Sequence, residues 1–187
     1  MTIACGAIIL AAGQSRRMGF NKLLADYRGK PLVAHVLDAV EAADLPAIVV
    51  LGHSAQEIRA ALTPSRAHFV LAEDYREGMG RSIAAGINAA PRDWQAAIIC
   101  LGDMPLVSPA LLRELAGKAS SSAILVPVFE GRRGNPVLWG RDHFHELETL
   151  QGDEGARKKI SRLDSRLASI SWHDDSILRD FDTPETL

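Results

Sequence analysis

Cysteine, aromatic residues and long apolar runs are all scarce in this chain of 187 residues. The two cysteines, Cys5 and Cys100, each lie between apolar neighbours, which favours core-filling thiols over a disulfide and indicates a reducing compartment. No apolar run reaches the roughly 18 residues that a membrane-spanning helix needs. The N-terminus also lacks the cationic region of a signal peptide. We therefore expect a soluble, cytoplasmic protein.

An excess of positive charge is missing as well. The formal net charge is −2, with 21 Lys and Arg against 23 Asp and Glu. This balance argues against a general nucleic-acid binder but leaves room for a local cationic pocket. Apolar residues make up 47% of the chain and charged residues 24%, as in ordinary folded domains. We expect one domain over residues 1–187, with neither nucleic acid nor membrane among its partners.

Short apolar runs alternate with stretches of helical spacing along the chain. Strands are predicted for residues 7–10, 48–51, 68–72, 96–101, 123–129 and 167–172, with 136–139 pairing nearby. Helices are predicted for residues 31–43, 54–62, 81–90, 143–150 and 155–163, and for a stretch that begins at 108. This alternation predicts an α/β fold, with a mainly parallel, Rossmann-like sheet in a three-layer α/β/α arrangement.

Two of the predicted helices carry a capping signal at their start. Ser54 with Glu57 three residues later matches a capping box. Ser108 followed by Pro109 matches an N-cap residue with proline at the first helical position. We therefore expect both serines to cap the helices that follow them.

The stretch Leu10–Lys22 directly follows the first predicted strand and is rich in small and cationic residues. Small residues let the backbone approach a ligand closely, and consecutive backbone N–H groups in such a turn can hold an anion. Arg17 and Lys22 add positive charge, whereas Arg16, as the neighbour of Arg17, is expected to point to solvent. The stretch matches neither a Walker A nor a GxGxxG motif, so an ordinary turn is the alternative to phosphate binding.

Asp103 follows the predicted strand 96–101 as the glycine-containing loop follows the strand 7–10. Ligands of parallel sheets bind beyond the carboxyl ends of the strands. Both features should therefore face one crevice.

Six short motifs, in order, resemble the small nucleotidyltransferases of the MobA/MocA type, and most closely the molybdenum cofactor cytidylyltransferases. They occupy residues 10–22, 78–86, 102–105, 133–136, 152–157 and 180–184, and so extend over nearly the whole chain. The resemblance implies the nucleotide-diphospho-sugar transferase type of α/β fold. It also implies transfer of CMP from CTP to the terminal phosphate of molybdopterin, with release of pyrophosphate.

Such a transfer depends on positioning and charge neutralisation, because the attacking phosphate is already anionic. Arg17 and Lys22 are expected to neutralise the triphosphate. Mg²⁺ prefers one or two carboxylates together with phosphate oxygens and water, and Asp103 with Asp182 is the expected pair, with Asp180 as the fallback. A turn role for Asp103 and a capping role for Asp182 are the competing interpretations.

The resemblance also implies residues that bind the two substrates. Ala12 stands where guanylyl relatives have glycine, which the resemblance associates with cytosine, and Ser82 either bonds the base or is a plain helix residue. Arg133 and Asn135 are implied for the acceptor, with an ordinary turn as the alternative. The implied nucleotide-binding residues are Leu10, Ala11, Ala12, Gly13, Arg17, Lys22, Gly78 and Ser82.

Two other functions stay open. The chain could be a guanylyltransferase or an NTP transferase for another phosphorylated acceptor, against which Ala12 is a modest argument. It could also be a non-catalytic partner that binds or inserts the molybdenum cofactor, which the joint presence of Arg17, Lys22, Asp103 and Asp182 disfavours. The resemblance to the molybdenum cofactor enzymes also implies a molybdoenzyme or its insertion chaperone as a partner.

Overall fold

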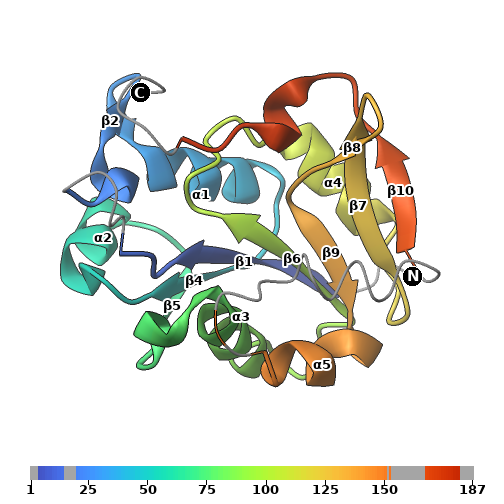
Figure 1. The fold of residues 1–187 in the computed structure, drawn as a ribbon, viewed down its shortest axis with the longest axis horizontal. Coiled ribbons are helices and arrows are strands. Elements are labelled where there is room, and N and C mark those ends of the chain that lie inside the picture. The colour runs from blue at the N-terminus through green and yellow to red at the C-terminus, as the bar shows by residue number, and fades with distance from the viewer. Residues whose placement is uncertain (1–3, 15–19, 151, 153–166, 182–187) are drawn as a thin grey trace.

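The computed structural model describes residues 4–14, 20–150, 152 and 167–181. One sheet of eight strands has the order β10-β7-β9-β6-β1-β4-β5, with β8 paired to β7 (Figure 1). Its strands are β1 (Cys5–Ala11), β4 (Ala47–Leu51), β5 (His68–Leu71), β6 (Ala96–Leu101), β7 (Ile124–Phe129), β8 (Arg132–Arg133), β9 (Val137–Gly140) and β10 (Leu167–Ser171). Two short strands, β2 (Asp26–Tyr27) and β3 (Lys30–Pro31), form a separate antiparallel pair.

Helices cover both faces of the large sheet (Figure 1). The α-helices are α1 (Leu32–Ala42), α2 (Ala55–Ala61), α3 (Met79–Asn88), α4 (Pro109–Gly117) and α5 (Phe144–Glu148). Short 3-10 helices are η1 (Lys22–Leu24), η2 (Tyr75–Glu77), η3 (Arg141–His143) and η5 (Asp175–Leu178). One buried cluster lies between the sheet and α1, α2 and α4, and a second lies between the sheet and α3 and α5. The predicted three-layer α/β/α fold is confirmed.

The sheet is parallel except around β8 and β9. Strand β1 pairs in parallel with β4 on one side and β6 on the other, and β10 pairs in parallel with β7. Strand β9 lies antiparallel between β6 and β7. Residues 137–140 therefore form a central strand of the sheet. The short apolar run had predicted only that this segment pairs nearby.

The capping prediction is confirmed at Ser108 and wrong at Ser54. The Ser108 hydroxyl accepts a hydrogen bond from the backbone N–H of Leu111 at 3.2 Å. Ser54 has a left-handed backbone, with φ of 54°, and its side chain makes no capping bond to α2. A capping serine needs extended dihedrals to reach the N–H groups of the first turn, and the tight connection from β4 does not provide them.

Two helix predictions also need new boundaries. The helix expected over residues 81–90 begins earlier, at Met79, directly after Gly78 with its positive φ of 119°. The stretch 143–150 contains the last residue of η3 and the short α5, which ends at Glu148, two residues before the predicted end. The helix predicted for 155–163 lies outside the described residues.

Both cysteines are free and buried, as the sequence predicted. Cys5 is paired in register with Ala96 and Cys100 with Ile9, so the two thiols are offset by four positions along neighbouring strands. Burial raises the pKa of each thiol to about 12. Within the described part of the chain, no helix combines the length and the apolar character required to cross a membrane.

Candidate functional site

Strands β1 and β6 end side by side, and this edge of the sheet carries Asp103. The backbone N–H of Gly102 donates to the Leu10 carbonyl at 3.0 Å, which extends the parallel pairing by one bond. A Cβ on Gly102 would lie 2.8 Å from the same oxygen, so a larger residue would push the strands apart. Asp103 is thereby held directly beside the segment that follows β1.

Lys22 and Asp103 form an ion pair across this edge. The Nζ of Lys22 lies 2.6 Å from Oδ2 of Asp103, and the two side chains are 15% and 19% exposed. A charge-assisted contact of this length, partly shielded from water, is stronger than an ordinary surface pair. The structure therefore brings together two of the predicted site residues that are 81 positions apart.

Lys22 is oriented by the short turn that it begins. The Oδ1 of Asn21 accepts a hydrogen bond from the backbone N–H of Leu23 at 3.1 Å, and Leu23 is only 4% exposed. The turn is thus capped at one end and anchored in the core by its middle residue. Asn21 was not among the predicted site residues, although an Asn before a short turn is a common capping signal.

The C-terminal segment runs back to Asp103. The backbone N–H of Phe181 donates to the Asp103 carbonyl at 3.1 Å, and the Phe181 ring meets Tyr27 edge-on at 4.9 Å between centroids. Asp180, the fallback metal ligand, has an exposed side chain. Asp182 and Arg17 lie outside the described residues.

The predicted acceptor segment is tied to the same C-terminal stretch. The backbone N–H of Asn135 donates to the Ile177 carbonyl at 2.9 Å, and a Cβ on Gly134 would lie 2.3 Å from that oxygen. Ile177 is completely buried, so this contact is part of the core. Arg133 lies exposed on β8. The C-terminal stretch therefore contacts both the acceptor segment and Asp103.

Helix α3 brings the second predicted nucleotide segment toward the end of β1. A Cβ on Gly86 would lie 2.4 Å from Cγ2 of Ile8, so the helix packs very closely on β1. Ser82 is 6% exposed in the first turns of this helix. The backbone N–H of Gly80 donates to the Gly152 carbonyl at 3.1 Å, which joins the start of α3 to part of another predicted motif.

Ala12 is more enclosed than the sequence suggested. It is 2% exposed and packs in the cluster on the α3 face of the sheet, and its carbonyl accepts from the His53 N–H at 3.3 Å. Its methyl group lies against Gly52, where an added Cβ would approach it to 2.8 Å.

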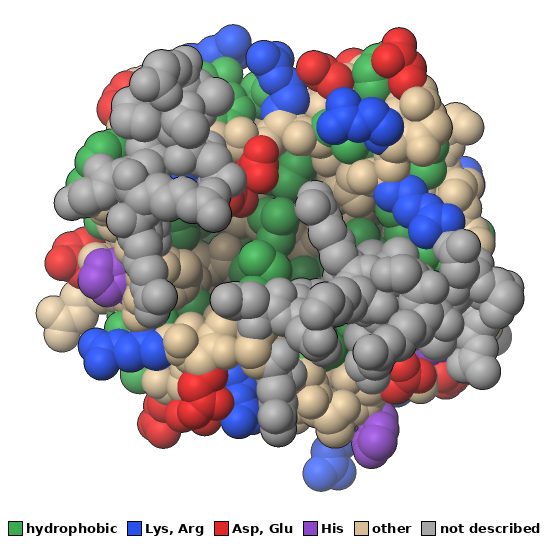
Figure 2. All heavy atoms as spheres, viewed as in Figure 1, with side chains coloured by type: hydrophobic (Ala, Val, Ile, Leu, Met, Phe, Trp, Pro, Cys, Tyr) green, Lys and Arg blue, Asp and Glu red, His purple; other side chains and the backbone are tan. Residues whose placement is uncertain are grey.

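Figure 2 shows an apolar hollow near the centre of one face of the molecule, with an acidic side chain at its upper edge. Among the described residues, no group of three or more His, Cys, Asp and Glu side chains could hold a metal ion. Asp103 alone still fits Mg²⁺, which commonly binds one protein carboxylate and completes its shell with substrate phosphates and water.

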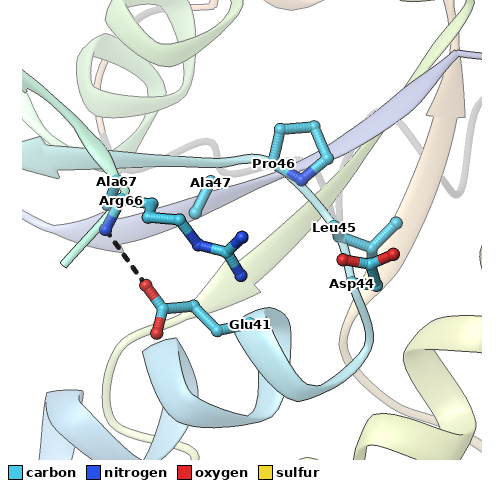
Figure 3. Close-up of a pocket in the computed structure, with 7 residues that line it drawn as sticks. All are labelled: Glu41, Asp44, Leu45, Pro46, Ala47, Arg66 and Ala67. Atoms are coloured by element: carbon cyan, nitrogen blue, oxygen red, sulfur yellow. Dashed lines mark hydrogen bonds between the residues drawn. The ribbon is translucent and has the colours of Figure 1, made fainter.

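A cavity of about 280 Å³ lies elsewhere, lined by Glu41, Asp44, Leu45, Pro46, Ala47, Arg66 and Ala67 (Figure 3). Its residues lie before β5 and before or at the first residue of β4, so it lies at the amino ends of these strands, opposite the site. The Glu41 carboxylate accepts from the backbone N–H of Arg66 at 3.3 Å. This cavity contains none of the predicted site residues.

The family described as "MobA-like NTP transferase domain" matches residues 7–167. The chain belongs to this family. A relative named "Bifunctional protein GlmU", from Rhizobium rhizogenes, is 34% identical over 177 residues, covering 92% of this chain and 38% of that protein. Among the curated relatives of this name, the chain spans 26% to 40% of their length.

Solved structures agree with this assignment. Rv0371c from Mycobacterium tuberculosis H37Rv is 28% identical, with a TM-score of 0.90 over 100% of this chain and 96% of that one. A second structure, of Rv0371c in complex with manganese, is 26% identical, with a TM-score of 0.81 over 92% and 89% of the two chains. The predicted resemblance is therefore confirmed as an NTP transferase domain, whereas its narrower MocA type remains a prediction.

Proposed function

We propose that this chain is a cytidylyltransferase that moves CMP from CTP to the terminal phosphate of a molybdopterin-type acceptor. The observation that carries the proposal is the Lys22–Asp103 ion pair, which holds a cation beside a carboxylate at the carboxyl ends of β1 and β6. A triphosphate with its divalent metal needs such a pair of charges, one for the phosphates and one for the metal. Membership of the NTP transferase family supports the general reaction.

Asp103 is the residue that would hold Mg²⁺, with Asp182 as the proposed second ligand. Bound there, the metal would supply charge neutralisation on the triphosphate. The backbone N–H of Phe181 donates to the Asp103 carbonyl. Asp182 is the next residue in the chain, which supports this pairing. The complex of the similar protein Rv0371c with manganese supports a divalent metal in this fold.

Lys22 and Arg17 are proposed to neutralise the phosphate oxygens as charge develops. An oxygen of the acceptor phosphate forms a bond to the α-phosphorus, and the bond from that phosphorus to the oxygen bridging to the β-phosphate breaks. Pyrophosphate leaves with the electron pair. No proton has to be removed from the acceptor, so the chain needs fixed positive charge there rather than a general base.

The base and the acceptor are proposed to lie on opposite sides of this charged centre. The nucleotide would lie at the end of β1 and the start of α3, in a site formed by Leu10, Ala11, Ala12, Gly13, Gly78 and Ser82. Ala11 and Ala12 are buried, so they would shape this site from behind rather than touch the base. The close packing of α3 on β1 supports this, because it draws the two segments together. Arg133 and Asn135 are proposed for the acceptor, and a molybdoenzyme or its chaperone for its onward transfer.

Pyrophosphate release, measured with CTP, Mg²⁺ and molybdopterin, tests the proposal. We expect Lys22→Met and Asp103→Asn each to lower kcat/KM by about 100-fold or more, since each removes a charge from the reacting centre. Lys30→Met is the matched control, because it breaks an ion pair between β3 and α1, with Asp38, in which both side chains are about half exposed. Activity in Asp103→Asn equal to that of the wild-type protein would contradict the role of this carboxylate.

A second candidate function is nucleotidyl transfer with another nucleotide and another phosphorylated acceptor. Relatives named GlmU, up to 34% identical to this chain, favour it. Binding of CTP, UTP and GTP, compared by calorimetry, separates the candidates. Tighter binding of GTP or UTP than of CTP would overturn the cytidylyl assignment and leave the transferase reaction standing.

A further inference from the structure

Tyr75 lies near Ala12, the residue associated above with base choice. Tyr75 begins η2, four residues before α3, and its side chain packs on the cluster that contains Ala12. Gly52, directly after β4, lies beside both residues. A Cβ on Gly52 would lie 2.7 Å from Cγ of Tyr75 and 2.8 Å from Cβ of Ala12. The tyrosine ring and the alanine methyl therefore both border the space that a side chain at position 52 would occupy.

This arrangement changes how Ala12 can influence a ligand. Only 2% of Ala12 is exposed, so its methyl group offers almost no surface that a base could touch in this structure. Ala12 would then influence the choice of nucleotide only indirectly, by positioning the side chains near it. The Tyr75 ring, which borders the same space at Gly52, is one such group. Because the interior is close-packed, loss of the Ala12 methyl would be felt by its neighbours.

Tyr75 is also linked to the segment proposed for the base. The backbone N–H of Gly78 donates to the Tyr75 carbonyl at 3.3 Å, and Gly78 leads directly into α3. On the outer side, Nε of Arg76 donates to the Tyr75 hydroxyl at 3.3 Å. A shift of the Tyr75 ring would therefore move the turn that carries Gly78.

We propose that Tyr75 is a specificity-determining residue, which acts with Ala12 across Gly52 to set the size of nucleobase that the site accepts. The inference rests on the proposed function, since it takes the base to lie between the end of β1 and the start of α3. With alanine at 12 the ring is held outward and the base side is narrow. Without that methyl, or without the ring, the turn before α3 can settle toward Gly52 and admit a purine.

Nucleotide affinities test the proposal without requiring the acceptor. We expect the affinity for GTP relative to CTP to rise about tenfold in Tyr75→Ala, the size of effect that a hydrophobic wall gives. Tyr75→Phe keeps the ring and loses only the bond from Arg76, and should leave this ratio unchanged. Ala12→Gly should raise it, and the double variant should raise it by less than the product of the two single effects, because residues in contact couple.

Phe69→Ala is the matched control. This ring lies on β5, next to β4, but packs on the opposite cluster of the sheet. It should cost a similar amount of stability and leave the GTP to CTP ratio unchanged. If Tyr75→Ala does not fold, Tyr75→Leu should give a smaller shift in the same direction.

An unchanged ratio in a folded Tyr75→Ala or Tyr75→Leu variant would overturn the inference, and so would independent effects at 12 and 75. A wild-type protein that prefers GTP would overturn the cytidylyl proposal instead. The two failures are distinguishable, because the first concerns the change in the ratio and the second its starting value.

Discussion

The position of Lys22 depends on the residue before it. Asn21 caps the turn that begins with Lys22, and Leu23 anchors that turn in the core. The Nδ2 of Asn21 is buried without a hydrogen-bond partner among the described residues. Burying an unpaired donor is costly, and the cap that the Asn21 oxygen makes to Leu23 offsets part of this cost while it holds the turn that carries the lysine.

Removing the cap should loosen this turn. We expect Asn21→Ala to lower the free energy of unfolding by about 1 kcal/mol, because Leu23 loses its acceptor. Asn21→Ser should lose less, since a serine oxygen can cap in the same way. Urea unfolding followed by circular dichroism measures both. An equal loss in the two variants would show that the Asn21 oxygen does not stabilise the turn.

At the scale of elements, Ser54 and Ser108 show where local patterns succeed and fail. Both serines precede a helix, and only Ser108 adopts the extended backbone that lets its hydroxyl reach the first turn. The path of the chain out of β4 decides the backbone of Ser54, and this path depends on contacts with Ala12 and Tyr75 that the local sequence does not contain.

We therefore expect the same substitution to have a larger effect at Ser108 than at Ser54. Ser108→Ala should lower the free energy of unfolding by about 1 kcal/mol, because it removes the bond to Leu111. Ser54→Ala should change it by less than about 0.5 kcal/mol, because no capping bond is lost there. Urea unfolding of both variants, side by side, measures the difference. A larger loss at Ser54 would mean that its side chain stabilises α2 in a way other than capping.

At the scale of the whole molecule, the alternation of strands and helices predicted the layers, because periodicity is a local property of the chain. The antiparallel position of β9 was not predictable, since strand order depends on contacts between distant segments. For the site, too, the sequence predicted the general location but not the individual contacts. That Lys22 and Asp103 share one edge followed from their places after parallel strands. Their direct ion pair, and the packing of Tyr75 on Gly52, required the assembled fold.

Chemical labelling of the two buried thiols tests whether the chain unfolds as one unit. We expect this of the single domain predicted for residues 1–187. Burial raises the pKa of both thiols to about 12, so the folded protein keeps them protonated at pH 8, where an exposed thiol is partly ionised and reactive. Cys5 and Cys100 lie on neighbouring strands in the same buried cluster. An aromatic disulfide reagent should therefore label neither thiol in the native protein.

With increasing urea, both thiols should become reactive over the range in which the circular dichroism signal is lost, as expected for a two-state domain. The single variants Cys5→Ala and Cys100→Ala report each thiol separately. Cys5 is near the N-terminus and 8% exposed, whereas Cys100 is completely buried, so local opening of β1 would label Cys5 first. Labelling of Cys5 before loss of the signal would show that β1, the strand that ends in the proposed phosphate-binding loop, opens independently of β6.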